Sequence, residues 1–326
     1  MRFIPKKILI IQTAFIGDVV LATALIEKLR ITFPNASIDF LVRKGNESLL
    51  DNHPYLHNVL IWDKTQGKLK NLFNLITQIR KTKYDLIVNP HRFASTGILC
   101  AFSRAQRTVG FSKNPFSLLY SKRYKHTIGN NTHEVDRNLN LIEEFTNKER
   151  VLPKLYPSEE DFKKVTQPFP YYCIAPASVW FTKQFPKEKW IELIKELPKD
   201  KLVLLLGAKS DNTLCEIIKK AVNKSNVLNY AGKLSFLESA ALMQKAEMNF
   251  VNDSAPLHFA SAVDAPVTAI FCSTVPEFGF TAVSSDAKVI QTDEKLSCRP
   301  CGLHGFNTCP KKHFKCAEIP ISKILR

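Results

Sequence analysis

Residues 7–18 read KILIIQTAFIGD, and this stretch decides the fold class. Its first part, Lys7–Ile11, has the length and apolar character of a buried strand, and a short loop follows it. Beyond Asp18, apolar residues recur at spacings of three and four, which predicts an amphipathic helix. These residues are Val20, Leu21, Ala24, Leu25 and Leu29. A strand that passes through a short loop into a helix is the first half of a βαβ unit.

The alternation of strand and helix continues along the chain. In the first half, further strands are predicted at 38–42, 59–62, 86–89 and 108–111, with a helix over 68–80. In the second half, strands are predicted at 172–175, 202–206, 227–230, 248–251 and 267–271, with helices over 187–197, 211–222, 234–246 and 256–263. Strands separated by helices imply parallel sheets with crossover helices.

The segment 152–170 separates the two series of strands. It holds four prolines and few apolar residues, which is typical of a linker. The length of 326 residues suits two domains. We therefore expect an α/β protein with two Rossmann-like, doubly wound domains, 1–160 and 161–326, that face a central cleft. Ligands of such sheets bind at the carboxyl ends of the strands.

Composition and charge limit the class of protein. Hydrophobic residues make up 45% and charged residues 23%, as in globular proteins. No apolar run approaches the roughly 20 residues of a membrane span, and the first strand begins too early for a secretory signal, so we expect a cytoplasmic location. The net charge is +16, and 26 basic against 15 acidic residues give +11 over positions 1–165. This surplus favours anionic partners, or reflects a Lys-rich composition without a function.

The eight cysteines fall into two groups. Four of them lie in apolar surroundings and are expected in the core; these are Cys100, Cys173, Cys215 and Cys272. The other four lie within 19 residues near the end, together with His304 and His313; these are Cys298, Cys301, Cys309 and Cys316. Their spacing is compatible with a structural zinc site. Of the two alternatives, zinc or no metal, we predict no metal and no cofactor.

The loop between the first strand and its helix carries the first candidate for catalysis. Gly17 permits a tight turn and a close approach of the backbone to a ligand. Asp18 could take the proton of an acceptor hydroxyl, or it could be a plain acidic residue favoured by the helix dipole. The loop lacks the Gly-x-Gly-x-x-Gly pattern, so the dinucleotide fingerprint is absent.

Loops of the second half suit a phosphate ligand. Lys183, in the polar loop 177–186, can neutralise a phosphate. Asp253 or Ser254 can cap the helix that follows 248–251, and free N–H groups at a helix start bind anions. His258, one turn into that helix, lies near the site or in the core. Asp211 could accept hydrogen bonds from ribose hydroxyls.

Together these motifs resemble the heptosyltransferase family of bacterial lipopolysaccharide core synthesis, the GT-B-fold glycosyltransferases that use ADP-heptose. The resemblance runs nearly end to end and is most specific at 15–23, 183–190 and 252–258. The segments 266–271, 276–280 and 133–137 are also similar to the family.

The resemblance implies an inverting, metal-independent transfer of heptose to the lipopolysaccharide inner core. It assigns Asp18 as the base on the acceptor and Lys183 as a diphosphate ligand. Asp253 and Ser254 match residues that hold the phosphates and the sugar, and Asp211 matches an acid that binds the ribose. Ala255 departs from the family, which usually has Gly there, and we expect its methyl group to tighten the sugar pocket and to affect the choice of donor. The predicted donor-binding residues are Ser178, Lys183, Asp211, Asp253, Ser254, Ala255 and His258.

The acceptor is expected on the basic first domain. Its predicted contacts are Gly17, Arg43, Arg92 and the basic run 122–126. We expect an anionic lipid-linked or phosphorylated glycan at the cytoplasmic face of the inner membrane, and no nucleic acid. Three alternatives are the same fold with another nucleotide sugar or acceptor, a basic nucleic-acid-binding protein, and a non-catalytic homologue. No nucleic-acid motif supports the second, and the retained Asp18, Lys183 and Asp253 disfavour the third.

Overall fold

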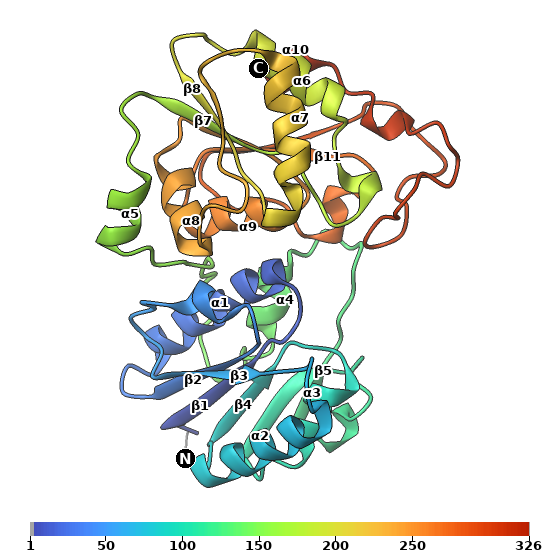
Figure 1. Ribbon diagram of the computed structural model, residues 1–326. Helices are drawn as coiled ribbons and strands as arrows, with labels where there is room; N and C mark the ends of the chain where they lie inside the picture. Colours follow the sequence, from blue (N-terminus) through green and yellow to red (C-terminus); the bar gives the residue numbers. More distant parts are fainter. Residues whose placement is uncertain (1–2, 326) are drawn as a thin grey trace. The chain divides into compact units, whose positions relative to one another are not determined.

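The computed structural model describes residues 3–325 and divides the chain into two compact units. The first unit runs to Ile128 and resumes over Thr132–Tyr156, and the second comprises Gly129–Asn131 and the chain from Pro157 onward. Each unit contains a six-stranded sheet with helices on both faces (Figure 1). All strand pairs are parallel. The predicted class of two Rossmann-like α/β domains is therefore confirmed.

The first sheet has the strand order β3-β2-β1-β4-β5-β6. The strands are β1 (Lys7–Ile11), β2 (Ser37–Arg43), β3 (Asn58–Trp62), β4 (Leu86–Asn89), β5 (Arg107–Phe111) and β6 (Lys122–Tyr124). The helices are α1 (Ile16–Thr32), α2 (Lys68–Thr82), α3 (Ala94–Ala101) and α4 (Glu134–Asn140). Helices α2 and α3 cover one face of the sheet, and α1 and α4 pack together on the other (Figure 1). The order reverses direction between β1 and β4, where the following loops diverge.

The second sheet repeats this plan in the order β12-β11-β10-β7-β8-β9. The strands are β7 (Tyr171–Ala175), β8 (Leu202–Leu205), β9 (Val227–Asn229), β10 (Met248–Asn252), β11 (Val267–Phe271) and β12 (Ala287–Gln291). The helices are α5 (Glu159–Val165), α6 (Lys187–Glu196), α7 (Asn212–Val222), α8 (Phe236–Lys245), α9 (Ala255–Ala262) and α10 (Ile321–Ile324). Its order reverses between β7 and β10. In open parallel sheets such a reversal creates the crevice in which ligands bind.

Several elements differ from the sequence expectations. The segment expected as a plain linker contains α5, which starts with a capping box between Ser158 and Asp161. The run expected to contact the acceptor, 122–126, contains the edge strand β6. Gly17 was expected in a tight turn, but it lies in the first turn of α1 and is not among the residues with positive φ. Its φ therefore does not require a glycine.

The four cysteines expected in the core are buried, as predicted: Cys100, Cys173, Cys215 and Cys272. Among residues 3–325, no helix has both the length and the apolar character needed to cross a bilayer.

Helix α2 offers a matched test of this packing. Leu75 is buried against the first sheet, whereas Leu69 in the same helix is 69% exposed. We expect Leu75→Ala to lower the free energy of unfolding by about 2–5 kcal/mol, because it leaves a cavity in a close-packed core. Leu69→Ala should change it by no more than about 0.5 kcal/mol. Urea denaturation of both variants measures the difference. Equal losses would show that α2 does not bury the Leu75 face.

Candidate active site

Asp18 lies in the first turn of α1, which a short loop connects to the carboxyl end of β1. The backbone N–H groups of Phe15 and Asp18 favour the ionised form of its carboxyl group. Burial and, to a smaller extent, the negative charge of Glu134 together raise the pKa of Asp18 to about 6, although the positive charge of Arg92 opposes both. A carboxylate with a raised pKa is a stronger base, and one that is ionised above pH 6 can take a proton at neutral pH. The environment of Asp18 therefore fits a general base better than a simple helix-start residue.

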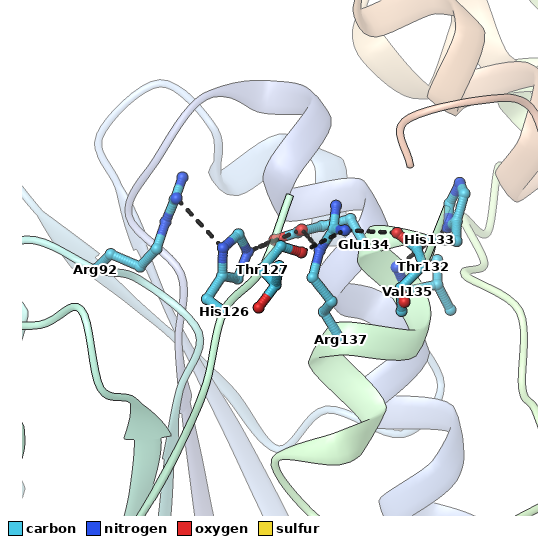
Figure 2. A network of polar contacts seen from close by, with 8 residues as sticks. All are labelled: Arg92, His126, Thr127, Thr132, His133, Glu134, Val135 and Arg137. Carbon is cyan, nitrogen blue, oxygen red and sulfur yellow. Dashed lines mark hydrogen bonds and ion pairs between the residues drawn. The ribbon is translucent and has the colours of Figure 1, made fainter. Parts of the chain in front are cut away.

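Glu134 begins α4 and is the centre of a buried polar network (Figure 2). Its carboxylate accepts hydrogen bonds from His126 Nε2 at 3.0 Å and from Arg137 Nε at 2.6 Å. On the other side of the imidazole ring, His126 Nδ1 lies 3.4 Å from a guanidinium nitrogen of Arg92. The bonds to Glu134 hold its pKa below the usual range, although burial acts in the opposite direction. Glu134 therefore stays ionised where Asp18 titrates.

The loop after β1 is held by Lys64, which the sequence did not single out. Lys64 Nζ donates to the carbonyl oxygen and to the hydroxyl of Thr13, both at 3.0 Å. The ammonium group also lies 4.6 Å from the centre of the Trp62 ring. Burial, with the charges of Arg43 and Lys68, lowers the pKa of Lys64 to about 8. Lys64 therefore fixes the loop that leads to Asp18.

The three residues expected to contact the acceptor follow three neighbouring strands. Gly17 precedes Asp18 in α1, Arg43 ends β2, and Arg92 follows β4. Arg43 lies over the ring of Phe15, with 5.2 Å between its guanidinium carbon and the ring centre. Arg43 and Arg92 are half-buried. Because the carboxyl ends of parallel strands share one sheet edge, these residues surround the start of α1.

In the second unit, the structure brings two predicted donor residues into contact. Lys183, after β7, forms an ion pair with Asp253, after β10, with 2.8 Å between Nζ and Oδ2. The same oxygen accepts a hydrogen bond of 2.6 Å from the hydroxyl of Thr274. Both side chains of the pair are mostly buried. This ion pair spans the reversal of strand order in the second sheet.

Asn252 joins the loops on either side of this reversal. Its side chain is fully buried, accepts a hydrogen bond from the N–H of Phe185 at 2.9 Å and donates to the carbonyl oxygen of Pro176 at 2.8 Å. Ser178 is half-buried in the same loop, and its carbonyl oxygen accepts from the side chain of Gln184 at 2.6 Å. The sequence placed Asn252 in a motif but did not predict this bracing role.

The start of α9 carries the remaining predicted donor residues. Ser254 is the N-cap residue, although its side chain does not cap the helix, and Ala255 is the first helical residue. A helix start without a side-chain cap leaves backbone N–H groups for an anion. His258 is buried within the same helix.

Asp211 follows β8, the strand beside β7, at the end of a short 3₁₀ turn. Its Oδ2 accepts the N–H of Ala208 at 2.8 Å, and its Oδ1 lies 3.2 Å from the hydroxyl of Ser210. Asp211 is half-buried and braces its own loop in this structure.

The four cysteines near the end of the chain lie in a loop region. Cys298 Sγ is 3.9 Å from His313 Nε2, and backbone N–H groups of residues 311–314 lower the pKa of Cys309, against the effect of its own burial. In the described part of the chain, no group of three or more His, Cys, Asp or Glu side chains is arranged to hold a metal ion.

Comparison with known proteins gives a consistent family. The model of glycosyltransferase family 9 (heptosyltransferase) matches residues 72–304. Lipopolysaccharide heptosyltransferase 3 of Escherichia coli K12 is 27% identical over 276 residues, which cover 79% of this chain and 80% of that protein. The lipopolysaccharide core heptosyltransferase OpsX of Haemophilus influenzae is 23% identical, with 82% and 79% covered.

Solved structures share the fold. The structure of E. coli ADP-heptose lipopolysaccharide heptosyltransferase II superposes with a TM-score of 0.79, at 19% identity, over 95% of this chain and 96% of that chain. E. coli heptosyltransferase WaaC, with ADP-2-deoxy-2-fluoro heptose, gives a TM-score of 0.73 at 18% identity. The GT-B fold class expected from the sequence is therefore confirmed. Because the family model matches well over half of the residues, the chain belongs to glycosyltransferase family 9, the heptosyltransferase family.

Proposed function

We propose that this protein transfers heptose from ADP-heptose to the inner core of lipopolysaccharide, with inversion at the anomeric carbon. The acceptor hydroxyl oxygen forms a bond to the anomeric carbon as the bond from that carbon to the diphosphate breaks. Asp18 takes the hydroxyl proton, and ADP leaves with the bonding electron pair. The observation that carries the proposal is the environment of Asp18, because burial and Glu134 raise its pKa to about 6.

The second unit would bind the nucleotide-sugar donor. Lys183 and the N–H groups at the start of α9 would stabilise the charge that develops on the leaving diphosphate. Asp253 orients the Lys183 ammonium group through their 2.8 Å ion pair. Asp211 is proposed for the ribose, and Ser178, Ser254, Ala255 and His258 for the phosphates and the sugar. Gly17, Arg43 and Arg92 are proposed for an anionic acceptor.

The base is tested by Asp18→Asn, which keeps the size of the side chain but cannot take a proton. We expect kcat to fall by about 10²–10⁴-fold, the usual contribution of a general base. Wild-type kcat should rise with pH through about 6 and then level off, because Asp18 acts in its ionised form. Glu27→Gln is the matched control, since Glu27 is a buried acid of the same helix that bonds Tyr156. Near wild-type turnover of Asp18→Asn would remove Asp18 from the reaction.

The donor site is tested by Lys183→Ala. We expect ADP to bind about 10- to 100-fold more weakly, because a charge-assisted contact to the diphosphate is lost. Lys189→Ala is the control, since Lys189 pairs with Glu192 on the surface of α6. Calorimetric titration with ADP measures both variants. Unchanged ADP affinity in a folded Lys183→Ala protein would exclude Lys183 from the donor site.

We also propose that the first unit binds an anionic membrane surface at the cytoplasmic side of the inner membrane, where a lipid-linked acceptor lies. Leu118 and Leu119 are 76% and 62% exposed in a short turn. Lys113, Lys122 and Arg123, which flank this turn, are exposed as well. Exposed leucines surrounded by cations suit the boundary between headgroups and acyl chains.

Vesicle co-sedimentation tests this membrane proposal. We expect binding to phosphatidylglycerol vesicles that weakens as salt rises, because exposed charges are screened within about 8 Å at 0.15 M. The double variant Leu118→Ser/Leu119→Ser should bind at least about tenfold more weakly, since two apolar side chains no longer insert. Leu69→Ser, at another exposed leucine of this unit, should bind normally. Equal binding of wild type to neutral and anionic vesicles would contradict the proposal.

A further inference from the structure

Glu134 acts on Asp18 through its charge, and it lies at the centre of a buried network. Side-chain exposures are 0% for His126, 7% for Glu134 and 3% for Arg137. Burying charges costs free energy even when they are paired. A protein in which well-packed apolar side chains replace a buried ion pair is often at least as stable as the original. A buried ion pair is therefore weak support for a purely stabilising role, and its position beside Asp18 becomes informative.

The hydrogen bonds fix the state of His126. Its Nε2 faces the Glu134 carboxylate, which can only accept, so Nε2 carries the proton. The guanidinium group of Arg92 can only donate, so Nδ1, at 3.4 Å from it, is the acceptor. The ring of Phe111 packs edge-on against the imidazole, with 4.5 Å between the ring centres. Glu134 thus holds Arg92 through the imidazole ring (Figure 2).

Arg137 holds Glu134 from the other side and ties down the preceding loop. Its NH1 donates to the carbonyl oxygens of Thr127 and Thr132, at 3.1 Å and 2.5 Å. Helix α4, which begins with Glu134, packs against α1, which carries Asp18. The network therefore fixes the position of the Glu134 charge relative to the start of α1.

We propose that Glu134 is a positioning residue for sugar transfer, which holds Arg92 through His126 and keeps a fixed negative charge beside Asp18. This inference rests on the proposed role of Asp18 as the base. The fixed charge makes Asp18 a stronger base, because a nearby anion disfavours its ionised form. Arg92, on the opposite side of His126, limits this effect and keeps a cation next to the reacting carboxylate.

The test follows the titration of Asp18 directly, by ¹³C NMR of protein labelled at the aspartate carboxyl carbons. Asp18→Asn assigns the resonance, because only that signal disappears. We expect a midpoint near pH 6 in the wild type and a midpoint lower by about half a pH unit or more in Glu134→Gln, since the neutral amide no longer opposes ionisation. Glu27→Gln removes a buried charge of α1 that does not act on Asp18, so its midpoint should match the wild type.

A second variant keeps the test decisive if Glu134→Gln does not fold. Arg92 is half-buried, and its charge lowers the pKa of Asp18, so Arg92→Gln should move the midpoint to higher pH. Midpoints that stay at the wild-type value in the folded variants, even with a lower melting temperature, would overturn the proposal and leave a structural role.

Turnover separates this inference from the proposed function. With ADP-heptose and lipopolysaccharide from a heptose-deficient bacterium as probes, the acid limb of kcat against pH should shift downward in Glu134→Gln. If Asp18→Asn turns over normally, the proposed function is wrong and this inference falls with it. If Asp18→Asn is inactive but the acid limb of kcat against pH in Glu134→Gln matches the wild type, the role of Asp18 as the base is retained and only the proposed role of Glu134 is wrong.

Discussion

The parallel direction of the strands, with one reversal of strand order in each sheet, is the constraint on which the rest of the structure depends. Parallel strands end at one edge, and at the reversal the two following loops diverge and leave room for a ligand. In the first sheet one of these loops leads to Asp18, in the first turn of α1, and the other carries Arg92. In the second they carry Lys183 and Asp253, which meet in an ion pair. The chain thus uses one arrangement twice, and each unit places one acid and one cation at the reversal.

The position of Asp18 favours reactivity over stability. Its pKa is about 6 in the folded protein and 3.8 without these surroundings, so the folded state binds more protons between these values. The contribution of Asp18 to stability is therefore present at low pH and is lost as pH rises through about 6. At neutral pH the folded protein holds an ionised carboxylate that burial and Glu134 disfavour. Ionisable groups whose pKa is perturbed in this way are common at functional sites.

Continuous apolar runs made most strands predictable. Strands β1 and β11 have the predicted bounds, because the buried residues of β1 are all apolar and Thr268 is the one polar residue of β11. Strand β6 was missed because Lys122–Tyr124 is a short, polar edge strand. Helix α5 had a local signal, the capping box at Ser158, hidden among prolines. The ion pair of Lys183 with Asp253 could not be predicted from sequence patterns, because it depends on the order of the strands in the second sheet. From the sequence, Glu134 was placed only within the segment 133–137 that is similar to the family. Its role could not be predicted, because that role depends on how α4 packs against α1.

The central claim is that the protein moves heptose from ADP-heptose to an inner-core acceptor. Incubation with equal concentrations of ADP-heptose and other nucleotide sugars, with lipopolysaccharide from a heptose-deficient bacterium, tests it most directly. Mass spectrometry of the acceptor identifies the added sugar, and NMR of the product shows whether the anomeric centre is inverted. We expect one heptose per acceptor, an inverted anomeric centre and an amount of ADP equal to the amount of heptose transferred. Transfer only from a different nucleotide sugar, or retention at the anomeric carbon, would contradict it.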